Sequence, residues 1–200
     1  FIHAMKIEQF MQMKFLHTTW DDIVKLCEKL ATKIVESGYK PDLIVAVSRG
    51  GFAPARILCD ILDIYTLASL SIKYYAGVAE RRDKPIVECP LNVDVKGKKV
   101  LLVDDVADTG HSLKVAVKHI RECGASDVKV ATLHYKPWSV FKPDFYGQET
   151  DAWVVYVWEI WETIRNLAEK LRSEGLSEEA IKNALISASF REEDVRKVLG

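Results

Sequence analysis

The chain has 200 residues, of which 48% are apolar and 28% are charged, a composition typical of globular proteins that excludes intrinsic disorder as the main state. With roughly 150 residues per domain as a guide, this length predicts one core with a small appendage. The 28 basic and 29 acidic side chains nearly cancel, so the chain has no overall positive field to hold nucleic acid or an anionic membrane. Any phosphate-bearing ligand must therefore be bound by a local site.

The cysteines and the apolar segments indicate a cytoplasmic protein. The four cysteines are far apart, without the close pairs of a zinc or redox motif, and we expect them to be reduced and mostly buried; they are Cys27, Cys59, Cys89 and Cys123. The sequence shows neither a signal-peptide pattern nor the ~18 consecutive apolar residues of a membrane span. We treat residues 1–12 as an N-terminal extension of uncertain origin, without an assigned function.

Helix and strand patterns alternate along most of the chain. Apolar residues at helical spacing predict a helix over residues 20–36, which ends before Gly38. A short apolar run over 43–47 is followed by Ser-Arg-Gly-Gly, which predicts a strand and a tight loop. The pattern continues with a helix over 52–62, a strand over 100–103, a loop over 104–112, a helix to about residue 121, and strands over 128–133 and 152–157. Buried strands that alternate with helices predict an α/β fold, with a mainly parallel sheet flanked by helices.

Strand patterns stop after Trp158, and helical patterns fill the rest of the chain. They predict a C-terminal extension of three helices, in which Ser177 caps the second and Ser189 forms a capping box with Glu192 before the third. We therefore expect a core over residues 13–158 and a helical extension over 159–200.

The chemistry is expected at the two strand-loop-helix junctions. Ligands of open parallel sheets bind outside the carboxyl ends of the strands. The segment 108–112 combines a glycine, two hydroxyl groups and consecutive backbone amides at a helix start, which suit a phosphate monoester. Asp104 and Asp105 follow an apolar strand, and their carboxylates suit ribose hydroxyls or a hydrated magnesium ion.

These segments resemble a known family. VLLVDDVADTG, over 100–110, resembles the phosphoribosyl diphosphate signature of the type I phosphoribosyltransferases, and IVAVSRGG, over 44–51, resembles their diphosphate-binding loop. Further segments are similar in order and spacing to the purine branch: TTWDDI, Tyr74-Tyr75, Tyr135-Lys136-Pro137, DAWV over 151–154 and Trp158-Glu159. The three-helix extension further resembles crenarchaeal purine phosphoribosyltransferases, which use adenine on a body related to the 6-oxopurine enzymes.

The resemblance implies a type I phosphoribosyltransferase fold and the transfer of phosphoribosyl from phosphoribosyl diphosphate to a purine. A nucleoside monophosphate and diphosphate are the products, Mg²⁺ is bound with phosphoribosyl diphosphate, and the protein is a homodimer. Asp108 is the implied catalytic acid or base, and Lys136, Trp153 and Val154 are the implied base contacts. The implied phosphoribosyl diphosphate contacts are Ser48, Arg49, Gly50, Gly51, Arg81, Asp104, Asp105, Asp108, Thr109, Gly110, His111 and Ser112, with Asp104 and Asp105 also at the metal.

The resemblance also implies two backbone features. One is a cis peptide bond between Ser48 and Arg49, and the other is a lid over residues 73–90 that carries Arg81 and excludes water. Each of these residues also has a structural alternative. Asp104 and Asp105 also suit a helix cap or the surface, and Gly50 and Gly51 suit an ordinary turn. His111 also suits a solvated position. Lys136 and Trp153 suit a structural role, and the arginines of the lid suit a solvated charge run.

The identity of the base stays open between two alternatives. Lys136 would donate to the 6-oxo group of hypoxanthine, guanine or xanthine, whereas the helical extension favours adenine. Val157 stands where the 6-oxopurine enzymes usually have proline, and we therefore favour adenine. A rival of another class is a regulator without catalytic activity that senses phosphoribosyl diphosphate and binds nucleic acid, against which the nearly neutral charge argues.

Overall fold

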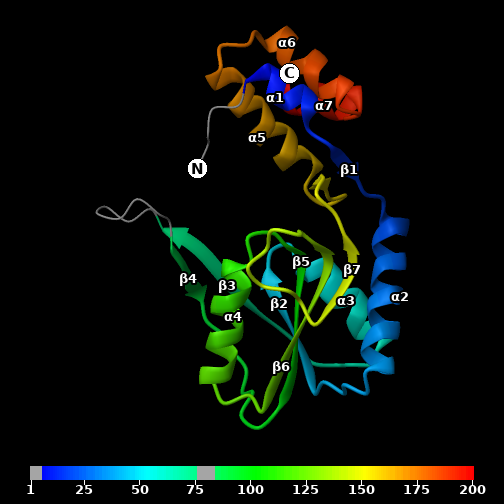
Figure 1. The fold of residues 1–200 in the computed structure, drawn as a ribbon, viewed down its shortest axis with the longest axis vertical. Coiled ribbons are helices and arrows are strands. Elements are labelled where there is room, and N and C mark those ends of the chain that lie inside the picture. The colour runs from blue at the N-terminus through cyan, green and yellow to red at the C-terminus, as the bar shows by residue number, and fades with distance from the viewer. Residues whose placement is uncertain (1–5, 76–83) are drawn as a thin grey trace. The chain divides into compact units, whose positions relative to one another are not determined.

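The structure is a computed structural model that describes residues 6–75 and 84–200 (Figure 1). It divides into two compact units. The first, here the sheet unit, is Asp21–Thr150, and the second, here the tail unit, combines the residues up to Trp20 with Asp151–Gly200. Sequence analysis placed the boundary after residue 158 instead.

The sheet unit is built on a six-stranded sheet with the order β4-β3-β2-β5-β6-β7. All neighbouring strands in it are parallel except β4, which runs antiparallel to β3. This confirms the predicted α/β fold with a mainly parallel sheet. The strands are β2 (Leu43–Ser48), β3 (Leu67–Tyr75), β4 (Lys84–Cys89), β5 (Lys99–Ala107), β6 (Asp127–Tyr135) and β7 (Phe145–Glu149).

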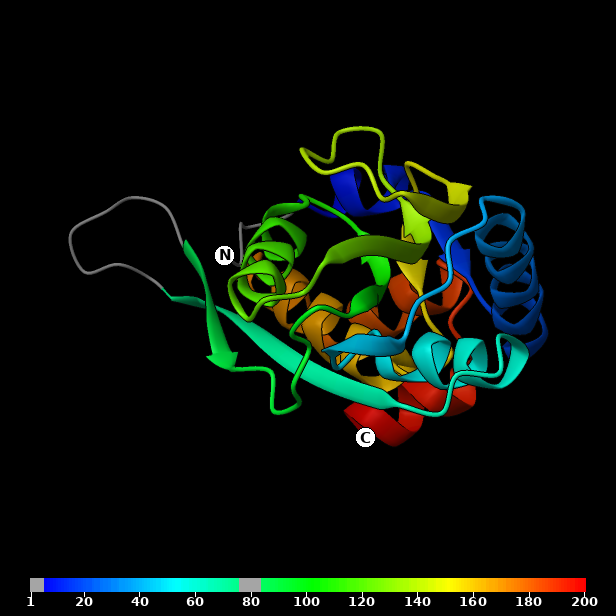
Figure 2. The ribbon, with the colours of Figure 1, turned by 90° about the horizontal axis from the view of Figure 1, so that it is seen from below.

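Helices cover both faces of this sheet. They are α2 (Trp20–Glu36), α3 (Phe52–Ile61) and α4 (His111–Glu122). Figure 2 shows α4 on one face and α2 with α3 on the other. Val45 and Leu102 on the central strands pack with Leu113 and Ile120 of α4 in one buried cluster. Because both faces are covered, the runs over 43–47 in β2 and 100–103 in β5 are apolar, as the sequence pattern predicted.

Several elements differ from the predicted pattern. Strand β5 continues to Ala107, so Asp104 and Asp105 lie in the strand and not in a loop. The strands β3, β4 and β7 were not predicted, because polar residues interrupt their apolar residues. Within the predicted lid, the described residues form the end of β3 and the strand β4.

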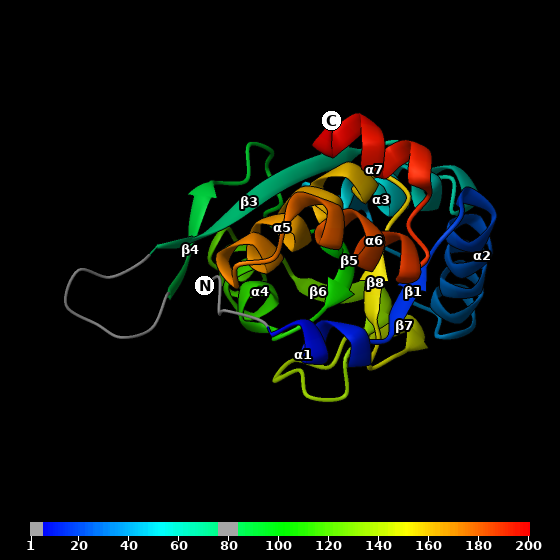
Figure 3. The same cartoon turned by 90° about the horizontal axis from the view of Figure 1, so that it is seen from above.

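The tail unit has its own small core. Strand β1 (Phe15–His17) pairs in parallel with β8 (Trp153–Val155), as Figure 3 shows. The helices are α1 (Ile7–Gln12), α5 (Ile160–Ser173), α6 (Glu178–Ser187) and α7 (Glu192–Leu199). Their buried side chains form one cluster with Val155 of β8; the cluster includes Phe10, Ile164, Leu167, Leu171, Ile181, Leu185, Phe190 and Val195. Residues 151–158 thus group with the tail because β8 pairs with β1, and α1 belongs to the same core through Phe10.

Two details of the prediction are wrong and one is confirmed. The hydroxyl of Ser177 accepts a hydrogen bond from the backbone amide of Ala180 at 3.2 Å and caps α6, as predicted. Ser189 does not cap α7, since its φ is 69° and the helix begins after Arg191. All four cysteines are free, but only half of them are buried; Cys27 and Cys59 are buried, whereas Cys89 and Cys123 are exposed.

Over the residues that the structure describes, no helix is long and apolar enough to span a membrane.

Candidate active site

The turn from β2 into α3 packs directly against β5. The peptide bond between Ser48 and Arg49 is cis, as predicted. A Cβ atom on Gly50 would lie 2.1 Å from Oδ2 of Asp105, and one on Gly51 would lie 2.3 Å from the backbone oxygen of Val103. Since real side chains do not approach so closely, both positions require glycine for space. The alternative of ordinary turn glycines does not account for this packing.

The two neighbouring acids at the end of β5 are held by their own backbone. Oδ1 of Asp104 accepts a hydrogen bond from the amide of Asp105 at 2.9 Å, and Oδ1 of Asp105 accepts one from the amide of Val106 at 2.7 Å. Burial raises the pKa of Asp105 to about 6, although the hydrogen bonds with Asp104 and Val106 lower it. Asp105 is therefore a carboxyl group of reduced acidity placed against the glycine turn.

The loop from β5 into α4 forms one wall of a cavity. Gly110, with φ of 85°, begins the helix in the left-handed region, which favours glycine. A Cβ atom there would lie 2.6 Å from the hydroxyl of Ser139 and from the amide nitrogen of Phe141. The cavity has a volume of about 320 Å³ and is lined by Tyr74, residues 104–110, Ser112 and Leu113. The exposed His111 does not line it, which agrees with its solvated alternative.

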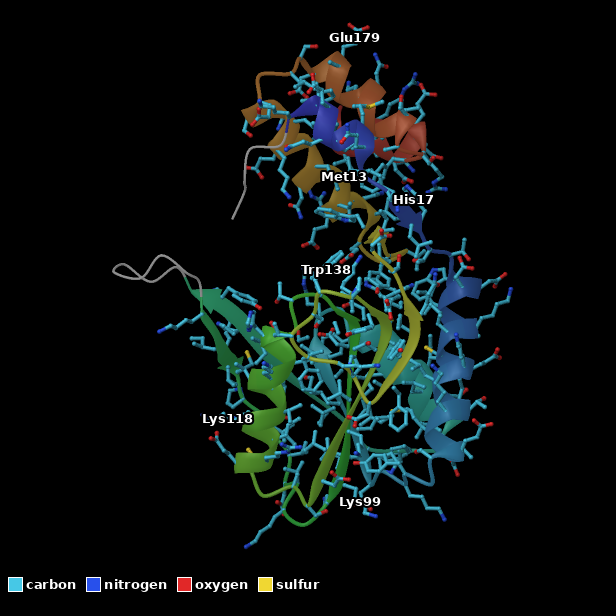
Figure 4. The ribbon with its side chains drawn as sticks, viewed as in Figure 1. Met13, His17, Lys99, Lys118, Trp138 and Glu179 are labelled. Carbon is cyan, nitrogen blue, oxygen red and sulfur yellow. The ribbon has the colours of Figure 1, made fainter. Side chains whose placement is uncertain are left out.

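Two aromatic residues at this site were not singled out as functional from the sequence. The hydroxyl of Ser112 donates a hydrogen bond to the phenol oxygen of Tyr74 at 3.1 Å. Nε1 of Trp138 donates one to Oδ1 of Asp108 at 3.0 Å, and Figure 4 labels Trp138 at this edge of the sheet. Nζ of the buried Lys136 lies 5.4 Å from the centre of the Trp138 ring. The structure thus brings Asp108, Lys136 and Trp138 together.

Comparison with known proteins decides the family. Residues 18–162 match the family model of the phosphoribosyl transferase domain. The chain belongs to this family. It is a phosphoribosyltransferase, and hence a glycosyltransferase, with the type I fold predicted from the sequence.

Three relatives illustrate the match. The xanthine-guanine phosphoribosyltransferase of Ruegeria sp. (strain TM1040) is 30% identical over 160 residues, covering 74% of this chain and 86% of that protein. The hypoxanthine-guanine phosphoribosyltransferase of Schizosaccharomyces pombe is 30% identical over 187 residues, covering 72% and 88%. The solved structure of a purine phosphoribosyltransferase from Pyrococcus horikoshii Ot3 is 39% identical, with a TM-score of 0.66, and covers 73% of this chain and 94% of that chain.

The predicted contacts of the phosphoribosyltransferase are divided between the two units. Trp153 and Val154 belong to the tail unit, where Val154 is buried and Trp153 packs against the tail core. Arg81, predicted on the lid, lies outside the described residues. The structure therefore groups the predicted sugar and phosphate contacts of β5 and its loop with one predicted base contact, Lys136, in the sheet unit.

The residues present fit a magnesium ion that arrives with a substrate. Among the described residues, no group of three or more acidic, histidine or cysteine side chains could hold a metal ion by itself. Asp104 and Asp105 offer two adjacent carboxyl groups on the cavity wall. Magnesium commonly keeps several waters and binds one or two carboxylates together with substrate phosphates. Asp104 and Asp105 are thus donors suited to a metal ion that is shared with a substrate.

Proposed function

We propose that the protein is a purine phosphoribosyltransferase of purine salvage that acts on a 6-oxopurine, namely hypoxanthine, guanine or xanthine. The observation that carries this proposal is the buried Lys136 beside the pair formed by Trp138 and Asp108. An ammonium group only donates hydrogen bonds, so it complements the 6-oxo group and not the 6-amino group of adenine. The names of the Ruegeria and Schizosaccharomyces relatives, which specify 6-oxopurines, support the same choice.

This choice replaces the preference for adenine drawn from the sequence. That preference depended on the helical extension and on Val157, whereas Lys136 is buried in the sheet unit beside Trp138, which donates a hydrogen bond to Asp108. The relatives named here give adenine no support. The resemblance of the tail to crenarchaeal adenine enzymes stays a prediction, as does the homodimer.

The phosphate contacts follow from the glycine turn and the loop before α4. In the proposed reaction, backbone amides of 48–51 bind the diphosphate, and those of 108–112 bind the 5′-phosphate of the ribose. Positive charge develops on the ribose ring as diphosphate leaves, so carboxylates near the sugar stabilise the transition state. Asp104 and Asp105 have this role. When bound, magnesium supplies positive charge that stabilises the leaving diphosphate.

The purine contacts complete the proposal. Asp108 accepts or donates a proton at the imidazole ring of the base, a contribution of about 10²- to 10⁴-fold in rate. Lys136 donates to the 6-oxo group, and Trp153 and Val154 carry over from the resemblance as contacts to the purine ring. Trp138 orients the carboxylate of Asp108 through its indole N–H.

The test is the release of diphosphate by the purified full chain. Phosphoribosyl diphosphate and magnesium are supplied with hypoxanthine, guanine, xanthine or adenine, one base at a time. We expect release of diphosphate with at least one 6-oxopurine, together with the matching nucleoside monophosphate. Binding of phosphoribosyl diphosphate without release for any base would instead support the regulator without catalytic activity.

A further inference from the structure

Strand β6 of the sheet unit carries a buried hydroxyl group that makes no hydrogen bond. Thr132 is fully buried, and its Oγ1 has no hydrogen-bond partner among the residues that the structure describes. Burying a hydroxyl group in this state costs free energy, because its hydrogen bonds to water are lost and not replaced. Valine has nearly the same shape without this cost, so packing alone does not explain a threonine here.

Thr132 lies directly beside Asp104. The two residues are paired in register across the parallel strands β5 and β6, so their side chains leave the same face of the sheet. Two positions earlier on this face, Leu102 and Val130 belong to the buried cluster that packs with α4. Each strand thus changes there from an apolar residue to a polar one, and Asp104 lines the active-site cavity. Because neighbouring strands are about 4.8 Å apart, rotation of the Asp104 side chain brings its carboxyl group within reach of the Thr132 hydroxyl group.

We propose that Thr132 is a positioning residue for Asp104, whose carboxylate accepts a hydrogen bond from the Thr132 hydroxyl group when phosphoribosyl diphosphate is bound. The proposal rests on the proposed function, in which this carboxylate lies near the ribose and the magnesium ion. In the structure, Oδ1 of Asp104 accepts a hydrogen bond from the amide of Asp105 at 2.9 Å. Contacts with the ligand turn the carboxylate away from its own backbone and toward β6, where Thr132 is the residue in register.

This role accounts for the unpaired hydroxyl group of the free chain. The group gains its partner only in the bound chain, so the new hydrogen bond contributes to ligand affinity and not to folding. A hydrogen bond to a carboxylate is also stronger than one between two neutral groups. The rival explanation is a hydroxyl group that the core tolerates without any role. Both explanations predict that its removal stabilises the free chain, but only the proposal predicts a loss of affinity.

Substitutions at two positions separate these explanations. Thr132→Val removes the hydroxyl group and keeps the shape, whereas Thr132→Ser keeps the hydroxyl group. Asp104→Ala removes the proposed partner, and combining it with Thr132→Val shows whether Thr132 acts through Asp104. Thr32→Val is the matched control on α2, because the hydroxyl group of Thr32 already donates a hydrogen bond to the backbone oxygen of Glu28 at 3.0 Å.

The experiment combines thermal unfolding of the free chain with calorimetric titration of phosphoribosyl diphosphate in the presence of magnesium. We expect Thr132→Val to raise Tm by about 2–4 °C, because an unpaired buried group is removed. The same variant should bind phosphoribosyl diphosphate about 10-fold more weakly, because the bound chain loses a hydrogen bond to a carboxylate. Thr132→Ser should keep most of the affinity, and Thr132→Val should change it little once Asp104 is alanine. Thr32→Val should leave the affinity unchanged and should not raise Tm.

Four results would overturn the proposal while leaving the proposed function intact. They are an unchanged affinity in Thr132→Val, an equal loss of affinity in Thr132→Ser, an equal effect of Thr132→Val with and without the Asp104 carboxyl group, and a Thr132→Val chain that is less stable or does not fold. The last result would show that the hydroxyl group is already paired in the free chain. An unmodified chain that binds no phosphoribosyl diphosphate would instead overturn the proposed function, and with it this role of Thr132.

Discussion

Asp104 and Asp105 are the residues on which the proposed sugar chemistry depends. Asp104→Asn and Asp105→Asn keep the shape of the side chain and an oxygen for the backbone amides that now bond to Oδ1. We therefore expect near-normal folding but a loss of about 10²- to 10³-fold in kcat/KM, because a charge near the developing cation is removed. Thermal unfolding and steady-state kinetics of the two variants check this. Near-normal activity in both would show that the sugar-binding assignment is wrong.

Asp108 has a different proposed role, and the prediction for it differs accordingly. Asp108→Ala removes the proton acceptor, so kcat should fall by about 10²- to 10⁴-fold while the affinity for phosphoribosyl diphosphate changes little. Trp138→Phe keeps an aromatic ring beside Lys136 and removes the N–H that bonds to Asp108 together with part of the indole, so kcat should fall less than in Asp108→Ala. If Asp108→Ala weakens phosphoribosyl diphosphate binding and keeps normal turnover, Asp108 is a phosphate-loop residue only.

His134 is buried in β6, and we expect it to make the free energy of unfolding depend on pH. Burial, and then the charge of Lys136, lower the pKa of His134 from 6.5 to about 4. The unfolded chain therefore takes up this proton at a higher pH than the folded chain, and the free energy of unfolding falls as pH decreases from 6.5 to 4. The full contribution is present above pH 6.5, and its loss amounts to about 3 kcal/mol at the acid end.

The check is denaturant unfolding of the full chain and of His134→Gln across this pH range. The variant should show a flatter dependence of stability on pH. The difference between the two chains isolates His134, since the raised pKa of Asp105 acts on both alike. Parallel curves for the two chains would contradict the prediction.

At the scale of elements, the strands with continuous apolar runs were predicted from sequence, whereas β3, β4 and β7, whose apolar residues are separated by polar ones, were not. The runs over 43–47 in β2 and 100–103 in β5 are continuous and apolar, so the sequence predicts them as buried strands. In β3, Ser69, Ser71 and Lys73 alternate with apolar residues, which is the period of a half-buried strand, so this strand was within reach of the sequence. Its pairing with β2 was not, because that pairing depends on contacts distant in sequence. Asp104 and Asp105 resemble loop residues, yet they lie in β5 because its partner β6 continues beside them.

For the candidate site, the sequence predicted the glycines and acids but not Trp138. Its glycines and acids have motifs with fixed spacing, and most of the predicted β5 loop residues line one cavity. Trp138 has no such motif, because a single tryptophan after Lys136-Pro137 is equally typical of a surface loop. Its N–H could be linked to Asp108 only once β6 had placed this loop beside β5.

At the scale of the whole molecule, the proposed base contacts Trp153 and Val154 belong to the tail unit, so we predict that loss of the tail affects purine binding. Truncation after Glu162 removes Leu167, Leu171 and Leu185 from the core that also holds Phe10 and Val155. We therefore expect the tail unit to lose its fold, and purine binding to weaken more than phosphoribosyl diphosphate binding, since the glycine turn and the loop before α4 belong to the sheet unit. Calorimetric titration with each ligand checks this. A folded truncation that binds purine as well as the full chain would contradict it.

The measurement that tests the central claim most directly is a competition between bases. The full chain is incubated with phosphoribosyl diphosphate, magnesium and an equimolar mixture of hypoxanthine, guanine, xanthine and adenine, and the nucleoside monophosphates are separated and quantified over time. Their initial rates give the ratios of kcat/KM directly. The account predicts that a 6-oxopurine nucleotide forms fastest and that Lys136→Met reduces its advantage over the adenine nucleotide. Faster formation of the adenine nucleotide by the unmodified chain would contradict the proposed role of Lys136 and the choice of base.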